Sequence, residues 1–411
     1  MPSHLASAVS SSNVSRRSFL QISTAASVAA VFGIPTEATL AYAQMEQQPP
    51  RDAVVIDANE NPLGPSAKAR QAAIDRVPHG GRYALWEATE VEQIFATQQG
   101  LSPEYVKVFP GSSMPLHYAV LAYTSPTRSY VTADPGYEAG MYASKSSGAR
   151  IVKVPLTRNH AHDVKAMLAA APDAGLFYVC TPNNPTGTMT SHADIEYLVA
   201  NKPKGSIVMV DEAYIHFSGG ASTLDLVKAN QDIIVLRTFS KAYGMAGLRC
   251  GFIIARPDVM ARVVAFSGWD AMPVTACAAA KASLLEPSLA PERKRINTQT
   301  RTSVFAWLDQ NGYSYIPSES NCFLLDTKRP GQEVRTAMAA QNVYIGRIWP
   351  IMPTYVRITV GTPEEMGRFQ SAFHHVMKNA VAVAVPAMPG RPQRYVSIDG
   401  LRIPGDFLLN S

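Results

Sequence analysis

The sequence has few cysteines and few charged residues. Their positions do not match the patterns of metal-binding or nucleic-acid-binding proteins. Four cysteines in 411 residues form no C-x-x-C pair and show no metal-ligand spacing with histidine. We therefore expect buried free thiols and no metal site, although spacing alone cannot assign a disulfide. Charged residues make up 17% of the chain, and the net charge of +5 comes from scattered lysines and arginines. This pattern predicts no nucleic-acid partner.

The first 43 residues differ from the rest of the chain. Arg16 and Arg17 precede a 13-residue apolar segment, Ile22–Ile34, which is too short for a bilayer span of about 20 residues. Ala41-Tyr42-Ala43 then offers a small-x-small cleavage site. The pattern resembles a twin-arginine signal, so we expect export by the twin-arginine machinery and a periplasmic or secreted protein. The alternatives are an uncleaved anchor or a basic tail on a cytoplasmic protein.

The middle of the chain alternates short β-branched runs with helical stretches, and 46% of the whole sequence is hydrophobic. This alternation predicts an α/β fold with a mostly parallel sheet between helices. The expected strands are Val106–Phe109, Ser129–Thr132, Ile151–Val154, Leu176–Cys180, Ile207–Val210, Ile233–Leu236 and Gly251–Ala255. Expected helices among them are Ser66–Arg76, Met114–Tyr123 and Asp163–Ala170.

The pattern becomes mainly helical from Pro273 onward and predicts a smaller α+β domain. The helices expected from there on are Thr275–Leu285, Pro291–Gln310, Gln332–Gln341 and Pro363–Lys378, and the strands are Asn321–Asp326, Val343–Ile345 and Tyr355–Val360. The domains expected are an N-terminal arm with part of the small domain (44–80), a large domain (81–285), a small C-terminal domain (286–380) and an extended tail (381–411).

The stretch from Thr238 to Gly251 carries the most specific chemical signal. Ser240 and Lys241 follow a buried strand in a Gly-rich turn, and Arg249 lies eight residues further on. A lysine amine at a strand end can attack an aldehyde, and an arginine with a hydroxyl can hold a phosphate. Pyridoxal 5′-phosphate is a cofactor with both groups. The alternative interpretation is a polar turn with two solvated cations.

Further polar and aromatic residues stand just beyond expected strands, where open α/β sheets bind ligands. They are Ser112 and Ser113 at a helix start, Tyr137, Asn184, Asp211 and Tyr214; Arg357 lies within a later strand. Each has an ordinary explanation in capping, turns or packing. Together they supply what pyridoxal chemistry needs: a carboxylate for the ring nitrogen, donors for the ring oxygen, a stacking aromatic, a phosphate site and an arginine for a substrate carboxylate.

As a set, six motifs are more specific than any one residue. They are Asn59-Glu-Asn-Pro-Leu-Gly-Pro65, Gly111-Ser-Ser113, Asn183-Asn-Pro-Thr-Gly187, Asp211-Glu-Ala-Tyr214, Ser240-Lys241 with Arg249, and Val356-Arg-Ile-Thr-Val-Gly-Thr362. From about Asn59 to Met377 the chain resembles the fold-type I aminotransferases of class I/II, and among them the histidinol-phosphate aminotransferases. The resemblance implies a fold-type I α/β architecture and a homodimer that uses pyridoxal 5′-phosphate.

The resemblance also assigns roles to the residues that match. Lys241 would be the catalytic residue, bonding the cofactor aldehyde as a Schiff base and then moving a proton. Asp211 would pair with the pyridine nitrogen, Asn184 and Tyr214 would bond the ring oxygen, and Tyr137 would stack on the ring. The phosphate would be held by Ser112, Ser113, Ser240 and Arg249, and by Tyr83 from the partner subunit. Arg357 would grip the substrate carboxylate, with Asn61 and Arg347 also expected at the substrate site.

One departure from the family bears on the substrate. Histidinol-phosphate enzymes usually carry a second, phosphate-binding arginine directly after a short strand, but here that place falls on Gly346 and Arg347 comes one residue later. A one-residue shift in a strand turns the side chain to the other face. We therefore expect a free amino acid as substrate, aromatic or basic, with Trp349 and Tyr344 near its side chain.

The expected reaction is transfer of an amino group from an amino acid, or a histidinol-phosphate-like amine, to a 2-oxo acid. The shared residues do not separate transamination from a racemase, β-eliminase, decarboxylase or oxidase that uses the same cofactor. A binding protein that does no chemistry is the other alternative. A complete lysine–carboxylate pair argues against it, because binding alone needs no such pair.

Overall fold

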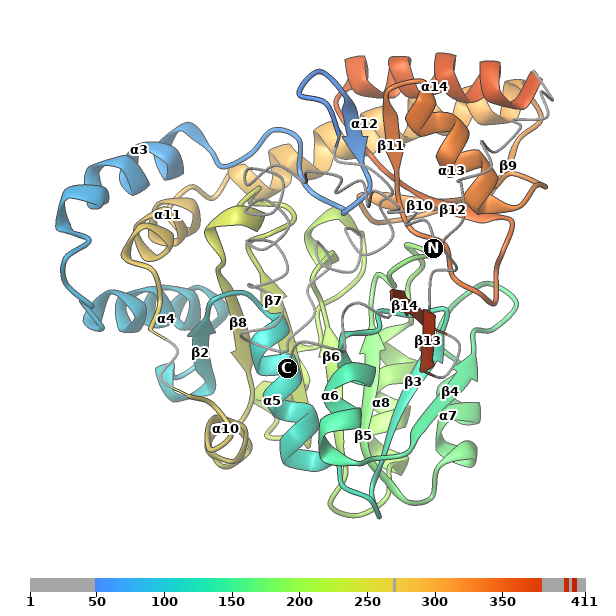
Figure 1. The fold of residues 1–411 in the computed structure, drawn as a ribbon. Coiled ribbons are helices and arrows are strands. Elements are labelled where there is room, and N and C mark those ends of the chain that lie inside the picture. Colours follow the sequence, from blue (N-terminus) through green and yellow to red (C-terminus); the bar gives the residue numbers. More distant parts are fainter. Residues whose placement is uncertain (1–48, 269–270, 379–394, 399–400, 405–411) are drawn as a thin grey trace, which may run out of the picture.

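The computed structural model describes residues 49–268, 271–378, 395–398 and 401–404, so the expected signal of residues 1–43 lies outside the described residues. A seven-stranded sheet with the order β2-β8-β7-β6-β5-β3-β4 forms the centre of the molecule (Figure 1). β8 runs antiparallel to both neighbours, and the other paired strands of this sheet are parallel. The strands are β2 Val106–Phe109, β3 Ser129–Asp134, β4 Ile151–Pro155, β5 Ala174–Cys180, β6 Ile207–Asp211, β7 Ile233–Thr238 and β8 Gly251–Ile254.

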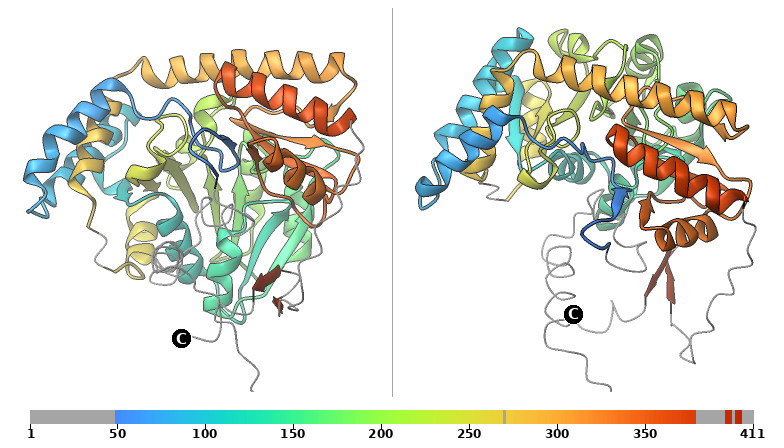
Figure 2. Two further views of the ribbon diagram at one scale, coloured as in Figure 1. Left: turned by 45° about the horizontal axis from the view of Figure 1, so that its top comes forward. Right: turned by 90° about the horizontal axis from the view of Figure 1, so that it is seen from above.

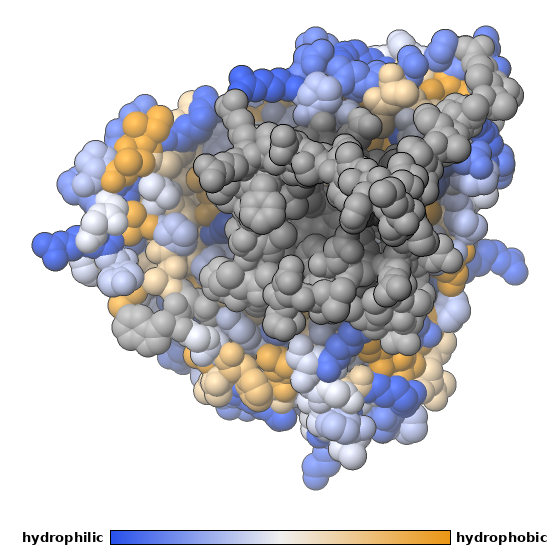
Figure 3. All heavy atoms as spheres, viewed as in Figure 1, coloured by the Kyte–Doolittle hydropathy of each residue, from blue (hydrophilic) through white to orange (hydrophobic). Residues whose placement is uncertain are grey.

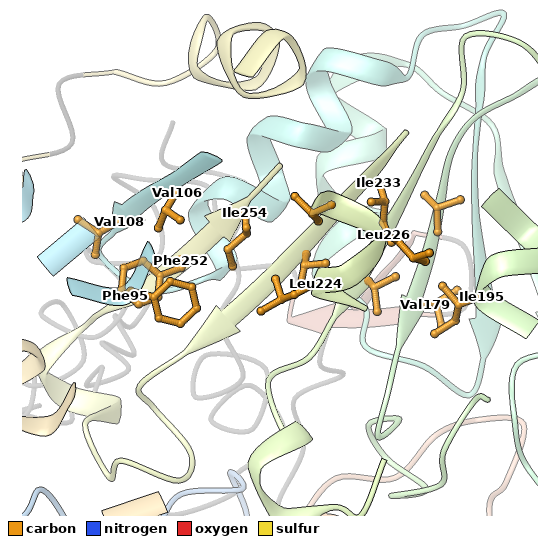
Figure 4. Packing of buried hydrophobic residues seen from close by; sticks show 14 of the residues in the cluster. Phe95, Val106, Val108, Val179, Ile195, Leu224, Leu226, Ile233, Phe252 and Ile254 are labelled. Carbon is orange, nitrogen blue, oxygen red and sulfur yellow. The ribbon is translucent and has the colours of Figure 1, made fainter. Parts of the chain in front are cut away.

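Helices cover both faces of this sheet, which is why its strands are apolar on both sides. One hydrophobic core contains residues of α3 (Ala67–Arg76), α4 (Trp86–Gln99), α7 (Val164–Ala170), α8 (His192–Asn201), α9 (Leu224–Lys228) and α11 (Val274–Leu284). The second core contains residues of α5 (Ser113–Tyr123), α6 (Ala139–Ser147) and α10 (Pro257–Val264). Successive strand residues alternate between the cores: Val208 and Val210 belong to the first, Ile207 and Met209 to the second. Figure 4 shows the first core, where Phe95 packs on Phe252.

A third hydrophobic core lies in a second unit built mainly from the end of the chain. Its antiparallel sheet has the order β12-β10-β9, and β1 pairs in parallel with β11. Its strands are β1 Val54–Ile56, β9 Ser314–Tyr315, β10 Cys322–Asp326, β11 Val343–Ile345 and β12 Tyr355–Thr359; its helices are α12 Leu289–Gln310, α13 Gly331–Ala340 and α14 Pro363–Lys378. α12 and α14 lie side by side along this unit (Figure 2). The pairing of β1 brings the N-terminal arm to the second unit.

The α/β fold with a mostly parallel sheet is confirmed, and every expected strand and helix is present to within a few residues. Ser66 begins α3 as expected, because its side chain accepts a hydrogen bond from the Ala69 amide. Several elements were not predicted individually, namely β1, β9, α4, α6, α8, α9 and α10. The domain boundaries stay a prediction.

The chain end differs in part from the extended tail that the prolines predict. β13 (Tyr395–Ile398) and β14 (Leu401–Pro404) pair as an antiparallel hairpin. The rest of 381–411 lies outside the described residues. Cys180, Cys250, Cys277 and Cys322 are buried free thiols, as expected. Among the described residues, no helix is both long and apolar enough to cross a bilayer.

Candidate active site

The sheet opens into a cavity of about 270 Å³ at the carboxyl ends of β5, β6 and β7. Its lining brings together nine of the residues expected at the site: Ser112, Ser113, Tyr137, Asn184, Asp211, Tyr214, Ser240, Lys241 and Arg249. They come from turns far apart in the sequence that the parallel strands deliver to one edge. Ala58 and Glu60 of the N-terminal arm also line the cavity.

Lys241 reaches the cavity from the turn that follows β7. Its Nζ lies 5.6 Å from the centre of the Tyr214 ring and donates to the Ala58 carbonyl at 3.2 Å. The side chain is buried, which is unusual for a lysine. Ser240 beside it accepts from the Thr238 hydroxyl at 3.0 Å, which stiffens the turn. The result is a desolvated amine held at a fixed place on the cavity wall.

Asp211 ends β6 and faces the same cavity. One carboxylate oxygen accepts from the Tyr178 hydroxyl at 2.8 Å, and the other accepts from the Ala213 amide at 3.0 Å. Burial raises the pKa of Asp211 to about 6, and the Tyr178 hydrogen bond opposes this rise. A cation opposite the carboxylate would favour its charged form further. The site therefore holds a carboxylate suited to a protonated ring nitrogen.

Arg357 of β12 is fully buried behind the cavity wall. Its Nη1 donates to Asn184 Oδ1 at 2.9 Å, and Nη2 donates to the carbonyl of Asp57. Asn59, in a left-handed conformation with φ of 55°, donates through Nδ2 to the Tyr214 hydroxyl at 3.0 Å. These bonds connect the two units at the cavity and fix the amide and phenol expected to face the cofactor ring.

Hydroxyls, backbone amides and a guanidinium converge at one end of the cavity. Ser112 precedes α5, and its side chain makes no capping bond to the helix. Arg249 Nη1 donates to the Ala246 carbonyl at 2.8 Å and lies 3.4 Å from Ser240 Oγ. A Cβ on Gly111, where φ is +89°, would fall 2.1 Å from Arg249 Nη2, so only glycine leaves room for the guanidinium. Burial lowers the pKa of Arg249. A half-buried cation beside a helix N-terminus fits a phosphate group.

Besides Arg357, three other expected residues lie away from the cavity lining. Asn61 donates to the Ala242 carbonyl at 3.1 Å and lines a small neighbouring cavity of about 30 Å³. Tyr83 is 76% exposed in the single chain. Arg347 forms an ion pair with Glu138, with its Nη2 3.1 Å from the carboxylate. Trp349 is buried and donates to the Gly136 carbonyl at 3.0 Å, whereas Tyr344 of β11 is half-buried.

Sequence reasoning missed Asn59, Tyr178, Asp57 and Glu138 as parts of this site. Asn59 stands in a quoted motif, and its sequence signal was the Asn-Glu-Asn-Pro turn. Tyr178 lies inside the apolar β5 run, where an aromatic residue is expected only to pack. Asp57 is buried, and burial raises the pKa of its carboxyl to about 6. No local pattern marks Tyr178, Asp57 or Glu138.

Fold and site together define an enzyme whose cavity suits a phosphate-bearing ring, with a buried lysine and a buried carboxylate on its wall. The family model for aminotransferase class I and II matches residues 51–373, and the chain belongs to this family. It is a pyridoxal 5′-phosphate-dependent aminotransferase. Of the reactions left open by the sequence, these findings support transamination.

Similar proteins agree with this assignment. The chain is 33% identical over 326 residues to a histidinol-phosphate aminotransferase of Symbiobacterium thermophilum, covering 78% of this chain and 90% of that protein. It is 31% identical over 331 residues to an aromatic amino acid aminotransferase of Cutibacterium acnes, covering 80% and 93%. A crystal structure from Erwinia carotovora atroseptica SCRI1043, described as a histidinol-phosphate aminotransferase, has a TM-score of 0.77 and 32% identity, covering 81% of this chain and 99% of that one.

Proposed function

We propose that this aminotransferase takes its amino group from a free amino acid rather than from histidinol phosphate. The observation that carries the proposal is the arrangement around Arg357. Its guanidinium reaches the cavity wall at Asn184, whereas the position expected for a second anion-binding arginine is Gly346. A Cβ on Gly346 would lie 2.6 Å from the Arg357 carbonyl oxygen, so no side chain fits there. The Arg357 end of the cavity is therefore suited to binding a single carboxylate.

Each residue around the cavity has a proposed task. Arg357 binds the substrate carboxylate and so directs the α-amino group toward Lys241. Asn184 and Tyr214 would hold the ring oxygen of the cofactor, Tyr137 would stack on the ring, and Asp211 would keep the ring nitrogen protonated. Ser112, Ser113, Ser240 and Arg249 would hold the phosphate.

The cofactor, when bound, supplies an aldehyde to receive the amino group and a ring that accepts the electrons of the broken C–H bond. Lys241 moves the proton of the substrate α-carbon through its Nζ. The neutral amine is the form that can accept a proton. Ala58 of the arm and the aromatic wall of Tyr137 and Tyr214 limit water at this atom.

The known relatives leave the substrate side chain open, since one is named for histidinol phosphate and another for aromatic amino acids. We propose an aromatic or basic free amino acid as donor and a 2-oxo acid as acceptor. Glu60, which lines the cavity, is suited to a basic side chain, and the indole of Trp349 lies 5.5 Å from the Arg357 guanidinium.

A donor screen tests this function. We expect one or a few free amino acids to discharge the loaded enzyme rapidly, with release of the matching 2-oxo acid measured by mass spectrometry, and histidinol phosphate to react at least about tenfold more slowly. Arg357→Gln should raise KM for the best donor about 10- to 100-fold, because a charged hydrogen-bond partner is lost. The exposed Arg295→Gln is the matched control. A clear preference for histidinol phosphate would refute the proposed substrate.

We propose that the enzyme works as a homodimer in which Tyr83 of each chain completes the phosphate site of the partner. Tyr83 and Trp86 are 76% and 67% exposed, and Ile74, Val77 and Leu85 of the same segment are also exposed. Figure 3 shows hydrophobic side chains on the surface over α3. Clustered apolar side chains of this kind mark an interface.

Trp86→Glu is expected to weaken the dimer, because the new carboxylate would have to be buried in the interface. Multi-angle light scattering should then give the mass of a single chain at concentrations where the parent gives twice that mass. Tyr197→Glu, at an exposed aromatic of α8, is the control and should leave the mass unchanged. A parent protein that is monomeric at every concentration would contradict the proposal.

We also propose that residues 1–43 direct export through the twin-arginine pathway, on the evidence of Arg16-Arg17, the short apolar segment and Ala41-Tyr42-Ala43. When the full-length chain is expressed in its native host, the protein should be recovered outside the cytoplasm and should lack about the first 43 residues. Arg16→Lys with Arg17→Lys should retain it in the cytoplasm. Equal recovery of both forms in the exported fraction would refute this.

A further inference from the structure

A second arginine, Arg347, lies beside the substrate end of the site, and its charge is neutralised by an ion pair with Glu138. Arg347 follows β11 and is buried, with 3% of its side chain exposed. Its Nη1 donates to Glu138 Oε1 at 3.2 Å and its Nη2 to Glu138 Oε2 at 3.1 Å. This is a two-bond arginine–carboxylate pair, the geometry in which the guanidinium is held most firmly.

Trp349 links this pair to the substrate anchor. The guanidinium carbon of Arg347 lies 4.7 Å from the Trp349 ring, and that of Arg357 lies 5.5 Å from the same ring. The indole is fixed by its hydrogen bond to the Gly136 carbonyl. Glu138 follows Tyr137, which lines the cavity. The ion pair is therefore next to the place where a substrate carboxylate would bind.

The two arginines differ in the groups that receive their hydrogen bonds. Two hydrogen bonds of Arg357 go to neutral oxygens, the side-chain amide of Asn184 and the carbonyl of Asp57. Arg347 donates to a carboxylate. Bringing a second anion close to Arg347 would require it either to displace Glu138 or to lie beside that negative charge. Like charges at close range disfavour each other, more strongly in a partly buried site.

We propose that Glu138 is a specificity-determining residue that neutralises Arg347 and so restricts the enzyme to substrates without an anionic side chain. Phosphate esters and amino dicarboxylic acids are thereby disfavoured relative to neutral and basic amino acids. This inference rests on the proposed function, because it assumes that Arg357 binds the substrate carboxylate.

Binding of unreactive carboxylates to the loaded dimer tests the inference without turnover. Pentanoate and glutarate have the same chain length and differ by one carboxylate. Calorimetry should show that the parent enzyme binds pentanoate more tightly than glutarate. Glu138→Gln should improve glutarate affinity relative to pentanoate by about 10- to 100-fold, the effect of one hydrogen bond to a charged partner.

Two controls separate this effect from a general loss of charge. Asp173→Asn breaks the exposed Arg150–Asp173 pair at the opposite end of β5 and should leave both affinities unchanged. Glu138→Gln combined with Arg347→Gln should lose the gain in glutarate affinity, because the freed cation is then absent.

Tighter binding of glutarate than of pentanoate by the parent enzyme would overturn the inference, and this result needs no variant to fold. An unchanged ratio in a folded Glu138→Gln enzyme would overturn it as well. Failure of the proposed function looks different, because histidinol phosphate would then discharge the loaded enzyme faster than any free amino acid, and Arg357→Gln would leave pentanoate binding unaltered.

Discussion

Lys241→Ala is expected to lower kcat for transamination by at least about 10³-fold while leaving the chain folded. The amine is buried on the cavity wall, over the Tyr214 ring, and we assign to it both attachment of the cofactor and proton transfer at the substrate α-carbon. General acid–base catalysis alone contributes about 10²–10⁴-fold, and the loss of the covalent anchor adds to this. Single-turnover release of 2-oxo acid is the measurement.

Two further variants separate chemistry from charge. Lys241→Arg keeps a cation in the cavity but cannot act as a base, because guanidinium does not lose its proton in proteins. It should therefore be as inactive as Lys241→Ala. Lys228→Ala, at an exposed position of α9, should behave like the parent enzyme. Turnover within tenfold of the parent in either Lys241 variant would remove this lysine from the mechanism.

The parts of the site that the sequence predicts are those whose signal is local. Lys241 and Asp211 each stand at the end of a β-branched run, and such ends meet at one edge of a parallel sheet. The seven-stranded sheet was predictable for the same reason, since buried parallel strands are apolar throughout. One missed helix, α4, has a charged residue, Glu92, among its buried positions, so its apolar stripe is interrupted.

The parts that the sequence leaves open depend on contacts between distant segments. Arg347 meets Glu138 across 209 positions, and Asn59 meets Tyr214 across 155. The position of a residue in a strand predicts the direction of its side chain. It does not predict which residue from a distant part of the chain will contact that side chain. Arg347 could be expected near the substrate from its place after a short strand. Its neutralisation by Glu138 follows only from the contact between the segment after β11 and the turn after β3.

Asp211→Asn is expected to have opposite effects on catalysis and on the stability of the cofactor-free protein. In the loaded enzyme, the variant removes the charge that keeps the ring nitrogen protonated. An opposite charge in such a position shifts a pKa by about 1–3 units, so kcat should fall about 10- to 1000-fold. Cofactor affinity, measured by equilibrium dialysis, should fall as well.

In the cofactor-free protein, burial raises the pKa of Asp211 from 3.8 to about 6. Between these values the folded state keeps a proton that the unfolded state has lost, so stability falls as pH rises through this window. Above about pH 6 the folded state holds a buried carboxylate at a constant cost. Asp211→Asn removes this cost and should raise the free energy of unfolding by about 1–3 kcal/mol at pH 7–8.

Urea unfolding of both cofactor-free proteins between pH 4 and pH 8 measures this difference. Asp57, whose pKa burial also raises to about 6, is present in both proteins, so subtraction isolates Asp211. The difference should grow from about pH 4 to pH 6 and then stay level. A difference independent of pH would mean that Tyr178 and the Ala213 amide already hold Asp211 as a carboxylate at its ordinary pKa. In that case, ionising Asp211 would cost the cofactor-free protein no stability. The activity lost in Asp211→Asn would then arise only in the loaded enzyme.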